Sequence, residues 1–362
     1  MRLAEARLLP RGLLLVPVSG GSGSGELQRA LLLARSARQR WPGLPIAIAA
    51  AASALPAAAD PGIDQVPLPG SPTRSSTEVI AAIRSRRPAV VIFDSTARPA
   101  QLRAARAVGA KVVYLSSRPS ARARGFRFGA LAQISEHWSV ELSLDATLPG
   151  RYQRWLLRWY QGLRWRPLGT LHEAPDPQRL PPELRDFVDA HPGFALFCPG
   201  GGGGRIEGRP AGDAFAEAAR ALQSPAVVVR ADWAASRTEH SDSVMRVGKL
   251  SNAALMALLQ RAELAVVGAG SMLLQAVSLE VPCVAVALAK DQSPRLQSLA
   301  AHGAVLECAP KTEAVITAAR QLSGDGSKRQ ALRTRSQTLG LRNGLEEALT
   351  ALEELVSRPL VT

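Results

Sequence analysis

Apolar and polar positions follow two alternating patterns along the chain. Short, nearly uninterrupted apolar runs are separated by longer segments in which apolar side chains recur every three or four positions. Such runs are typical of strands that a parallel sheet buries on both faces, and the longer period is typical of helices that cover the sheet. The pattern predicts an α/β fold. Strands are expected over residues 12–18, 44–50, 88–94, 110–116, 194–200, 225–231, 263–269 and 282–288.

The expected strands form two groups of four, and each group with its helices is typical of a Rossmann-like, doubly wound domain. The length of 362 residues also suits two domains. Prolines and polar residues dominate residues 166–187, where we place the boundary. We therefore expect an N-terminal domain over residues 1–170, a C-terminal domain over 188–342 and a last helix within 343–362 that could pack on either domain.

Hydroxyl side chains mark the start of two expected helices. Thr77 opens the segment TEVIAAIRSRR, and Ser251 opens SNAALMALLQRA. Threonine and serine are favoured caps because their side-chain oxygen accepts a hydrogen bond from a backbone N–H of the first turn. We therefore expect helices that begin at these two residues.

The net charge of the chain indicates which partners its surface attracts. The formal net charge is +14 and the isoelectric point is about 10.9, so the surface attracts anions such as nucleic acid, acidic phospholipid or phosphorylated substrates. Cys198, Cys283 and Cys308 are widely spaced within apolar runs, which favours neither a disulfide framework nor a metal site. A cytoplasmic protein fits best, and the inner face of the cytoplasmic membrane is one location for its basic surface.

The N-terminus superficially resembles a secretion signal. However, Glu5 interrupts its basic region and no small-residue cleavage site follows at the right distance. We interpret the apolar run as a first buried strand. No apolar run approaches the roughly 20 residues that a membrane-spanning helix needs, so we do not expect an integral membrane protein.

Two glycine-rich loops follow the first expected strand of each half. They read PVSGGSGSGE and PGGGGGRIEG, and neither has the full dinucleotide fingerprint nor the Gly-Lys-Ser/Thr of a P-loop. Glycine lets backbone N–H groups approach a phosphate closely, and a following helix N-terminus favours negative charge. We expect the pair to face a cleft, although a tight bend without a ligand explains the glycines as well. The candidate residues are Gly20, Gly21, Ser22 and Gly23 in the first loop, and Gly201, Gly202, Gly203, Gly204 and Arg205 in the second.

A third segment, over residues 262–308, is more specific. A strand ends in Gly268-Ala269-Gly270-Ser271, Pro282 opens the next strand, and Asp291-Gln292 follows it. This order resembles the nucleotide-sugar-binding half of GT-B glycosyltransferases. It is most similar to the lipid II N-acetylglucosaminyltransferase family and the related nucleotide-sugar hydrolase of pseudaminic acid synthesis. The resemblance implies two Rossmann-like domains that face a cleft.

The resemblance also implies roles for individual residues. Gly270 and Ser271 would face the donor diphosphate, with Gly201 to Gly204 as the opposite wall, and Gly268 would also belong to the donor site. Gln292 would contact the donor sugar, with Asp291 beside it. The glutamate that grips the ribose in the family falls on Gln275, whose amide is a weaker acceptor for a diol than a carboxylate is.

The first loop lacks the catalytic base that the family carries there. Where relatives carry a histidine, this chain has Gly25 and Glu26. An inverting transfer needs a group that takes the acceptor proton, and a positioned carboxylate can do so. Asp94, at the end of an expected strand, and Glu26 are the candidates, and we favour Asp94 because open α/β sheets bind ligands beyond the carboxyl ends of their strands. Alternatively, Asp94 caps the helix near Pro99 and Glu26 stabilises its own helix N-terminus.

Two lone histidines are the remaining candidates for a catalytic group. His137 and His240 stand alone, without a companion at ligand spacing. No Asp-x-Asp triplet and no His/Cys cluster occurs, so we expect neither a metal nor another cofactor.

The segment RYQRWLLRWYQGLRWR, residues 151–166, has an unusual composition. On a helix Tyr152, Trp155, Leu156, Trp159 and Leu163 share one face, while Arg151, Arg154 and Arg158 share another. The arginines of residues 118–131, interleaved with phenylalanine, extend the basic character. Such surfaces suit an anionic membrane, although the apolar face could instead pack on its own domain. No nucleic-acid-binding module accompanies the segment.

These observations together predict a metal-independent glycosyltransferase of the GT-B class. It would move a sugar from a nucleotide diphosphate donor to a hydroxyl acceptor, with a lipid-linked or cell-envelope acceptor as one option. A nucleotide-sugar hydrolase or epimerase on the same fold is the alternative enzyme. A GT-B protein that binds a partner without turnover is the alternative outside enzymes.

Overall fold

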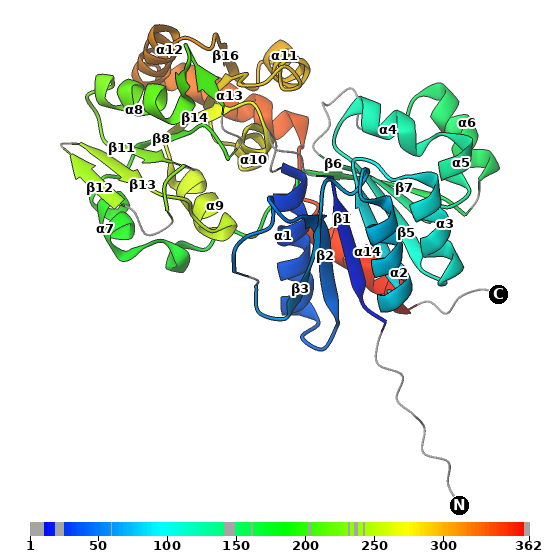
Figure 1. Cartoon of the computed structure of the whole chain (residues 1–362). Coiled ribbons are helices and arrows are strands. Elements are labelled where there is room, and N and C mark those ends of the chain that lie inside the picture. The colour runs from blue at the N-terminus through cyan, green and yellow to red at the C-terminus, as the bar shows by residue number, and fades with distance from the viewer. Residues whose placement is uncertain are drawn as a thin grey trace, which may run out of the picture. The chain divides into compact units, whose positions relative to one another are not determined.

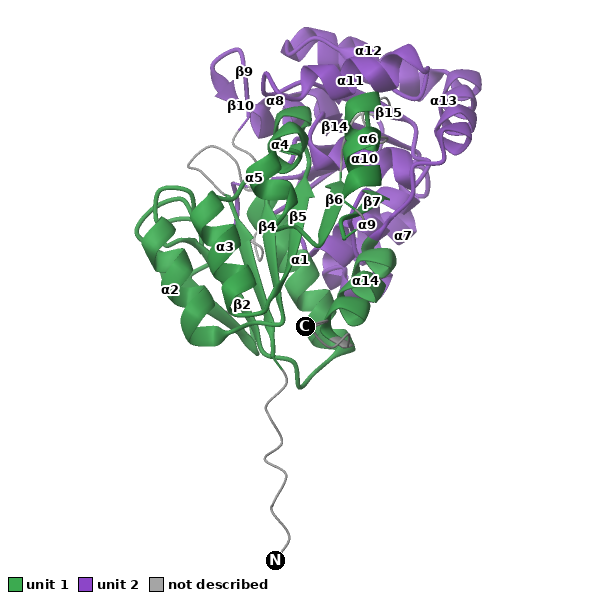
Figure 2. Ribbon diagram, turned by 90° about the vertical axis from the view of Figure 1, so that its right-hand side faces the viewer, with its two compact units in different colours: residues 1–140, 148–168, 345–362 green, residues 141–147, 169–344 purple. Residues whose placement is uncertain are grey.

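A computed structural model of the chain describes residues 11–18, 25–58, 60–140, 149–160, 162–201, 204–230, 232–234, 238–241 and 243–357. The chain forms two compact units, which Figure 2 shows in different colours. Unit 1 comprises residues 1–140, 148–168 and 345–362, and unit 2 comprises residues 141–147 and 169–344. The last helix of the chain therefore belongs to unit 1.

Unit 1 contains a seven-stranded sheet in the order β3-β2-β1-β4-β5-β6-β7. The neighbours from β3 to β6 pair in parallel. The central strands β1 and β4 are buried along their whole length, as their uninterrupted apolar runs predict. The strands are β1 (Leu13–Pro17), β2 (Ile46–Ala51), β3 (Ile63–Leu68), β4 (Val90–Asp94), β5 (Lys111–Ser116), β6 (Glu136–Val140) and β7 (Arg164–Gly169).

Helices cover both faces of this sheet (Figure 1). On one face, α2, α3, α5 and α6 contribute side chains to an apolar cluster that includes Leu14 and Val16 of β1. On the other face, α1 places Ala30 and Leu33 beside Leu15, and α14 contacts α1 and β4. The helices are α1 (Gly25–Arg40), α2 (Ser76–Arg86), α3 (Pro99–Ala107), α4 (Pro119–Gly125), α5 (Phe128–Leu131), α6 (Arg151–Trp159) and α14 (Leu345–Ser357).

Unit 2 contains a second seven-stranded sheet, in the order β12-β13-β11-β8-β14-β15-β16. All neighbours are parallel except the edge pair of β12 and β13. The strands are β8 (Ala195–Cys198), β11 (Ala226–Val229), β12 (Thr238–Ser241), β13 (Val244–Val247), β14 (Leu264–Gly268), β15 (Cys283–Val286) and β16 (Leu306–Cys308), with a separate hairpin of β9 (Arg205–Ile206) and β10 (Arg209–Pro210).

Two apolar clusters lie on opposite faces of the unit 2 sheet. One combines the sheet with α7, α9, α10 and α11, and the other with α8 and α12. The helical elements are the 3-10 turn η2 (Pro177–Arg179) and the helices α7 (Pro182–Ala190), α8 (Ala211–Ala221), α9 (Asn252–Arg261), α10 (Ser271–Ser278), α11 (Ser293–Ala301), α12 (Thr312–Gly324) and α13 (Gly326–Leu339). All eight expected strands are present, and the predicted α/β class with two parallel sheets is confirmed.

The two helix starts behave differently. Ser251 caps α9, because its hydroxyl accepts a hydrogen bond from Ala254 N at 3.3 Å. The start expected at Thr77 is wrong, since α2 begins at Ser76 and follows Ser75. The Ser75 hydroxyl accepts from Gly70 N at 3.0 Å and makes no capping bond to the helix. The preceding turn therefore uses the side chain that could have capped α2.

The two ends of the long segment of unit 2, residues 169–344, are tied to each other. Thr170 N donates to Arg342 O at 3.1 Å, and Gly344 N donates to Thr170 O at 2.8 Å. Gly169 adopts φ 70°, and a side chain there would clash with the carbonyl oxygen of Arg342. Glycine is required at this position because the two strands of chain run so close together.

The last helix is held in unit 1 by ion pairs as well as by apolar contacts. Arg40 at the end of α1 pairs with Glu346 at 2.9 Å and with Glu353 at 3.2 Å. Arg164 of β7 pairs with Glu354 at 3.0 Å. Leu349 and Leu352 on the same helix are buried. The helix that could have packed on either domain therefore completes the first one.

Candidate active site

Each sheet has a switch point where the strand order reverses. The first strand of unit 1, β1, lies between β2 and β4, and the first strand of unit 2, β8, lies between β11 and β14. Open α/β sheets bind ligands beyond the carboxyl ends of their strands at such points. The register places Pro17 opposite Asp94 in unit 1 and Cys198 opposite Val267 in unit 2. The loops that follow these four residues are therefore where a ligand is expected.

In unit 2, two glycines are required because neighbouring groups approach their backbones closely. A Cβ on Gly268, at the end of β14, would clash with the carbonyl oxygen of Pro199 in the loop after β8. A Cβ on Gly204 would lie 2.8 Å from the Cβ of Leu288 in the loop after β15. Three loops thus meet at this edge of the sheet with no side chain on either glycine.

The residues expected to face a donor lie around the same edge. Gly270 precedes α10, which begins at Ser271. Gln292 Oε1 accepts from Leu288 N at 2.9 Å, and Gln292 Nε2 would lie 3.5 Å from a Cβ on Gly270. Asp291 is exposed in the preceding loop. The structure therefore brings Gln292 next to the start of α10.

A guanidinium group that the sequence analysis did not single out lies at this edge as well. Arg295, in the first turn of α11, donates through Nη1 to the carbonyl oxygen of Ala269 at 3.4 Å. It places positive charge beside the loop that leads into α10. No local sequence pattern distinguishes Arg295 from the other arginines of this basic chain, because its position depends on contact between two separate loops.

Two other residues that were predicted to bind the donor form hydrogen bonds with backbone carbonyl groups. Gln275 is only 6% exposed, and its Nε2 donates to the carbonyl oxygen of Leu171 at 3.3 Å. Its amide thus holds the segment by which the chain enters unit 2. Arg205 donates through Nε to Gly208 O at 2.9 Å within its own hairpin. The residues Gly20, Gly21, Ser22, Gly23, Gly202 and Gly203 lie outside the described residues, while Gly201 is described.

In unit 1, Asp94 ends β4 and is 3% exposed. Arg29 of α1 forms a bidentate ion pair with it, with Nε 2.9 Å from Oδ2 and Nη2 3.1 Å from Oδ1. Burial raises the pKa of Asp94 to about 6, and the Arg29 charge opposes this shift. Asp94 does not form the cap expected at the helix near Pro99, because α3 starts after Arg98, whose N–H is bound by the side chain of Gln101.

The second predicted base, Glu26, lies in the same cluster. It is 6% exposed, and its Oε1 accepts from Arg118 Nη2 at 3.1 Å and from Ser95 Oγ at 3.3 Å. The Ser95 hydroxyl is also 3.2 Å from Asp94 Oδ1. The structure therefore joins both predicted carboxylates through residues that sequence reasoning missed. The one available signal was Arg29, a charged residue among the buried apolar positions of α1.

The two solitary histidines occupy contrasting places. His137 of β6 is fully buried among aromatic rings, and its Nε2 lies 3.0 Å from Ser116 Oγ. Burial lowers the pKa of His137 to about 3, so the ring is neutral near pH 7. His240 is exposed on the edge strand β12, where its ring lies 5.3 Å from the ring of Phe187.

The basic aromatic segment forms a shorter helix than expected. The prediction of one helix through residue 166 is wrong, because α6 ends at Trp159 and β7 starts at Arg164. Glycine at 162 disfavours a continuing helix. The predicted face is also divided, because Leu156 is fully buried whereas Trp159 is 71% exposed.

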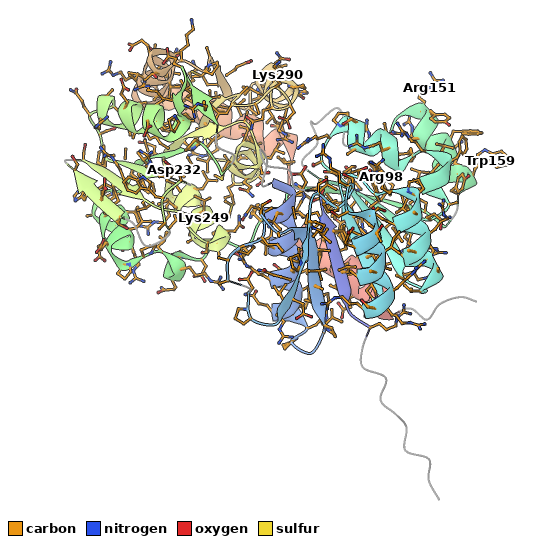
Figure 3. All side chains as sticks on the ribbon, viewed as in Figure 1. Arg98, Arg151, Trp159, Asp232, Lys249 and Lys290 are labelled. Carbon is orange, nitrogen blue, oxygen red and sulfur yellow. The ribbon has the colours of Figure 1, made fainter. Side chains whose placement is uncertain are left out.

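The exposed side of α6 carries three aromatic rings. Tyr152 stacks on Trp155 with centroids 5.9 Å apart, and Trp155 lies 5.8 Å from Trp159. Figure 3 shows Arg151 and Trp159 projecting away from the ribbon of this helix. We call the set of exposed α6 side chains the aromatic ridge. It consists of Arg151, Tyr152, Arg154, Trp155, Arg158 and Trp159.

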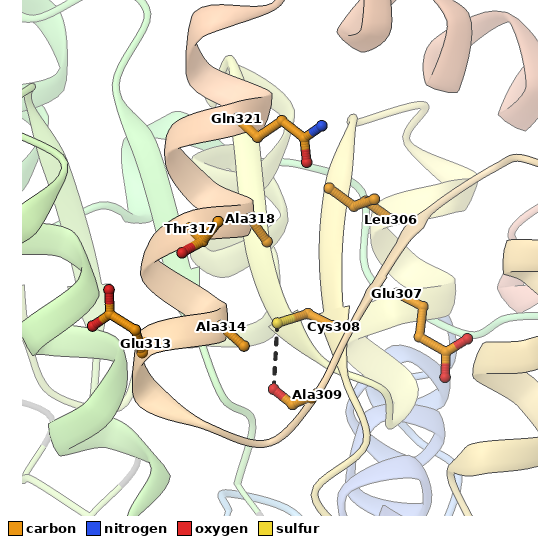
Figure 4. Close-up of a pocket in the computed structure, with 9 residues that line it drawn as sticks. All are labelled: Leu306, Glu307, Cys308, Ala309, Glu313, Ala314, Thr317, Ala318 and Gln321. Carbon is orange, nitrogen blue, oxygen red and sulfur yellow. Dashed lines mark hydrogen bonds between the residues drawn. The ribbon is translucent and has the colours of Figure 1, made fainter.

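A hollow of about 380 Å³ lies elsewhere in unit 2, between the edge strand β16 and α12. Figure 4 shows its walls, which include Glu307, Cys308, Glu313 and Thr317. None of the predicted donor residues lines it.

Within the described ranges, no three His, Cys, Asp or Glu side chains are grouped as a metal site would require. In the same part of the chain, every helix is too short or too polar to cross a bilayer.

No protein-family model and no curated protein sequence matches the chain. Solved structures match it over nearly its whole length. UGT2 of Phytolacca americana, complexed with UDP-2fluoro-glucose and pterostilbene, superposes with a TM-score of 0.65 at 12% identity, covering 96% of this chain and 100% of that chain. The spinosyn forosaminyltransferase SpnP gives 0.63 at 16% identity, with the same coverage. The glycosyltransferase VinC in complex with dTDP gives 0.60 at 17%, again with that coverage.

The chain has the GT-B fold. Two parallel-sheet units with these strand orders and whole-length superposition on glycosyltransferases establish it. Identities of 12 to 17% establish the fold alone. The finer resemblance, to the lipid II enzymes and the pseudaminic acid pathway hydrolase, stays a prediction. Within the GT-B fold, the edges at Asp94 and at Gly268 are the switch points of the two units.

Proposed function

We propose that this protein is a metal-independent glycosyltransferase that moves a sugar from a nucleoside diphosphate to a hydroxyl acceptor. One observation carries the proposal. At the switch point of unit 2, Gly204 and Gly268 let the loops after β8, β14 and β15 come close together near the start of α10, with no side chain at either glycine. Backbone N–H groups at a helix N-terminus suit a diphosphate. The GT-B neighbours named above include one complexed with UDP-2fluoro-glucose and one complexed with dTDP.

In this proposal unit 2 binds the donor. Gly270 and Ser271 contact the diphosphate, with Arg295 as a nearby positive charge and Gln292 toward the sugar. Positive charge and N–H groups stabilise the diphosphate as it leaves with the electron pair of the broken glycosidic bond. Arg205 remains a second candidate for this charge, although its hydrogen bond to Gly208 O must then be exchanged.

We further propose that the acceptor is lipid-linked and that the aromatic ridge contacts an anionic membrane from the cytoplasmic side. The exposed rings of Trp155 and Trp159 support this, because tryptophan favours the headgroup region of a bilayer. The arginines between them meet lipid phosphate, and the net charge of +14 adds attraction at longer range. Phe128, 59% exposed on α5, adds apolar surface.

Binding of nucleotides tests the donor site. Calorimetric titration of the folded protein with UDP, dTDP, UMP and dTMP should show tighter binding of the diphosphates than of the monophosphates. Absence of binding for all four at millimolar concentration would remove the proposed function. Added EDTA should leave binding and turnover unchanged, because no metal takes part.

Product analysis separates the proposal from its rivals. A panel of UDP and dTDP sugars is incubated without an acceptor and then with membrane extracts as a source of lipid acceptors. Transfer predicts a glycosylated lipid only when the extract is present. Free sugar without an acceptor would indicate a hydrolase, and an altered nucleotide sugar would indicate an epimerase. Tight nucleotide binding with no product in either arm would favour the binding protein without turnover.

Vesicle sedimentation tests the membrane contact. The protein should bind vesicles that contain phosphatidylglycerol and release them as salt rises, because screening weakens the attraction. The double substitution of Trp155 and Trp159 by serine should reduce binding while leaving the midpoint of thermal unfolding nearly unchanged, since both rings are exposed. Ser replacement of Trp41, which is partly exposed on the loop after α1, is the matched control. Equal binding of all three proteins would contradict the contact.

A further inference from the structure

One hydroxyl lies between the two carboxylates of the unit 1 cluster. Ser95 Oγ is 3.3 Å from Glu26 Oε1 and 3.2 Å from Asp94 Oδ1. A hydroxyl has one proton to donate, so it can serve only one of these oxygens at a time. The two carboxylates therefore share a donor, and the charge state of one affects the other.

Ser95 also has a backbone conformation that serine rarely adopts, with φ 75°. A non-glycine residue in this left-handed region is strained and persists only where its surroundings fix it. Here the carbonyl oxygen of Ser95 accepts from Tyr114 Oη at 3.0 Å and from Arg124 Nη2 at 3.2 Å. The strain is thus maintained from β5 and α4, and the hydroxyl is directed at the carboxylates. Strain retained beside buried charges is typical of a functional position.

The two carboxylates differ in what their oxygens already contact. Both oxygens of Asp94 are engaged by Arg29, whose side chain is 4% exposed. Both hydrogen bonds of Glu26 fall on Oε1, and its partner Arg118 is 48% exposed. Among the described residues, Oε2 of Glu26 is therefore the carboxylate oxygen of this cluster that remains to accept a proton. Glu26 thus contacts a partner that solvent reaches, whereas Asp94 contacts a buried one.

Resting on the proposed function, we propose that Glu26 is the catalytic base and that Ser95 is the positioning residue that ties it to the Asp94–Arg29 pair. The acceptor hydroxyl gives its proton to Glu26 Oε2. The acceptor oxygen then forms a bond to the anomeric carbon as the bond from that carbon to the diphosphate breaks. The nucleoside diphosphate leaves with the electron pair, so charge and atoms balance. This replaces the sequence-based preference for Asp94.

The role given to Ser95 follows from the charges around it. Glu26 and Arg29 face Asp94 from α1, Ser95 faces it from the end of β4, and Arg29 also contacts Ser117 Oγ at 3.3 Å. Asp94 with Arg29 is electrically neutral and closed to an acceptor. Holding Oε1 of Glu26 against Ser95 and Arg118 leaves Oε2 in one orientation, which is what a general base needs.

Carboxyl 13C NMR titration tests the linkage without any substrate. The Ser95 hydrogen bond lowers the pKa of Asp94, whereas the charge of Glu26 raises it. Ser95→Ala should therefore move the Asp94 titration to higher pH, and Glu26→Gln should move it to lower pH. Ser85→Ala, on the exposed part of α2, is the control and should leave it in place. If neither variant moves the Asp94 titration, the hydroxyl does not join the carboxylates and the proposal fails.

Turnover tests the base itself, using whichever nucleotide sugar the wild-type protein converts. Glu26→Gln should lower kcat by a factor of about 10² or more with little change in the donor KM, because a general base contributes about 10²–10⁴. Full turnover by Glu26→Gln would overturn the assignment even if the NMR linkage holds. A wild-type protein that binds no nucleotide would instead overturn the proposed function, and the base with it, while the titration would still report on Ser95.

Two substitutions separate the hydroxyl of Ser95 from its backbone conformation. Ser95→Gly removes the hydroxyl and relieves the strain, since glycine accepts a positive φ, whereas Ser95→Ala removes the hydroxyl and keeps the strain. Both should lower kcat by a similar factor, on the order of tenfold, and shift the acidic limb of the pH–rate profile. Wild-type kcat and pH profile in Ser95→Gly would show that the hydroxyl has no positioning role.

Discussion

Arg29 spans both carboxylate oxygens of Asp94, with side-chain exposures of 4% and 5% for the two partners. Removing one partner of such a pair leaves a buried charge uncompensated, which costs about 3–5 kcal/mol. Arg29→Met should therefore lower the free energy of unfolding by this amount in urea titrations. Arg35→Met breaks a partly exposed pair with Asp60, and should cost only about 0–1 kcal/mol.

The double variant Arg29→Met/Asp94→Leu sharpens this test. Replacing a buried ion pair by apolar side chains is often neutral or stabilising, so the double variant should recover most of the lost free energy of unfolding. A single variant as stable as the wild type would contradict the burial of the pair. Activity should not return with stability, because Ser95 then no longer ties Glu26 to the Asp94–Arg29 pair.

The pH dependence of stability has two opposed contributions in unit 1. The pKa of Asp94 is raised by burial from 3.8 to about 6, so the folded state binds its proton more tightly than the unfolded state does. The stability that Asp94 contributes is greatest below pH 4 and is lost as pH rises to about 6. The pKa of His137 is lowered by burial from 6.5 to about 3, so its contribution is present above pH 6.5 and is lost as pH falls.

Single variants should expose the two slopes. Between pH 4 and 6, each group alters the free energy of unfolding by up to about 1.4 kcal/mol per pH unit, with opposite sign. Asp94→Asn should therefore make stability rise more steeply with pH over this range, and His137→Leu should flatten the rise. Urea unfolding at several pH values measures both. Changes of the same sign in the two variants would show that one of these groups is not buried as described.

Gly268 and Gly270 make a matched pair for the donor site. An alanine Cβ at 268 would clash with Pro199 O, whereas at 270 it would lie 3.5 Å from Gln292 Nε2, an ordinary contact. Gly268→Ala should lower both stability and nucleotide binding. Gly270→Ala should keep the thermal midpoint within a few degrees of the wild type but weaken UDP or dTDP binding at least tenfold, since its methyl group occupies the approach to α10. Unchanged affinity in Gly270→Ala would place the diphosphate elsewhere.

Gln275 gives a prediction that opposes the family pattern. Its amide nitrogen donates to Leu171 O in a buried position. Gln275→Glu would set a carboxylate against that carbonyl and leave it without its donor, which costs about 1–3 kcal/mol. The variant should therefore be less stable in urea and bind nucleosides no better. Tighter binding at unchanged stability would mean that this side chain turns toward a ribose.

The strands that were predicted correctly from the sequence are those whose own residues indicate that they are buried. The runs that form β1, β4, β8 and β14 are apolar throughout because each lies between two neighbours and two helix layers. The edge strands β3 and β12 were missed because water reaches them, so they carry polar residues, and β3 tolerates Pro67. β6 was missed because the partner of its buried Glu136, Arg166, lies 30 residues away.

The candidate site likewise contains some residues that a local sequence pattern indicates and others that it does not. Asp94 was found because a carboxylate at the end of an apolar strand is a local pattern. Ser95 was not found, because contacts with Tyr114 and Arg124 impose its positive φ. A serine in the sequence does not indicate such a conformation. For α6 the period predicted a helix, but which side is buried depends on the surface that receives Leu156.

The return of α14 to unit 1 has a consequence for synthesis of the protein. Leu349 and Leu352 complete the layer beside α1, yet they leave the ribosome after all of unit 2. The second unit can therefore fold while the first still exposes the apolar face that α14 will cover. Until α14 has been made, the nascent chain presents this apolar face, which a chaperone or a second chain could cover. The part of unit 1 that precedes unit 2 in the sequence is therefore fully enclosed only after unit 2 has been made.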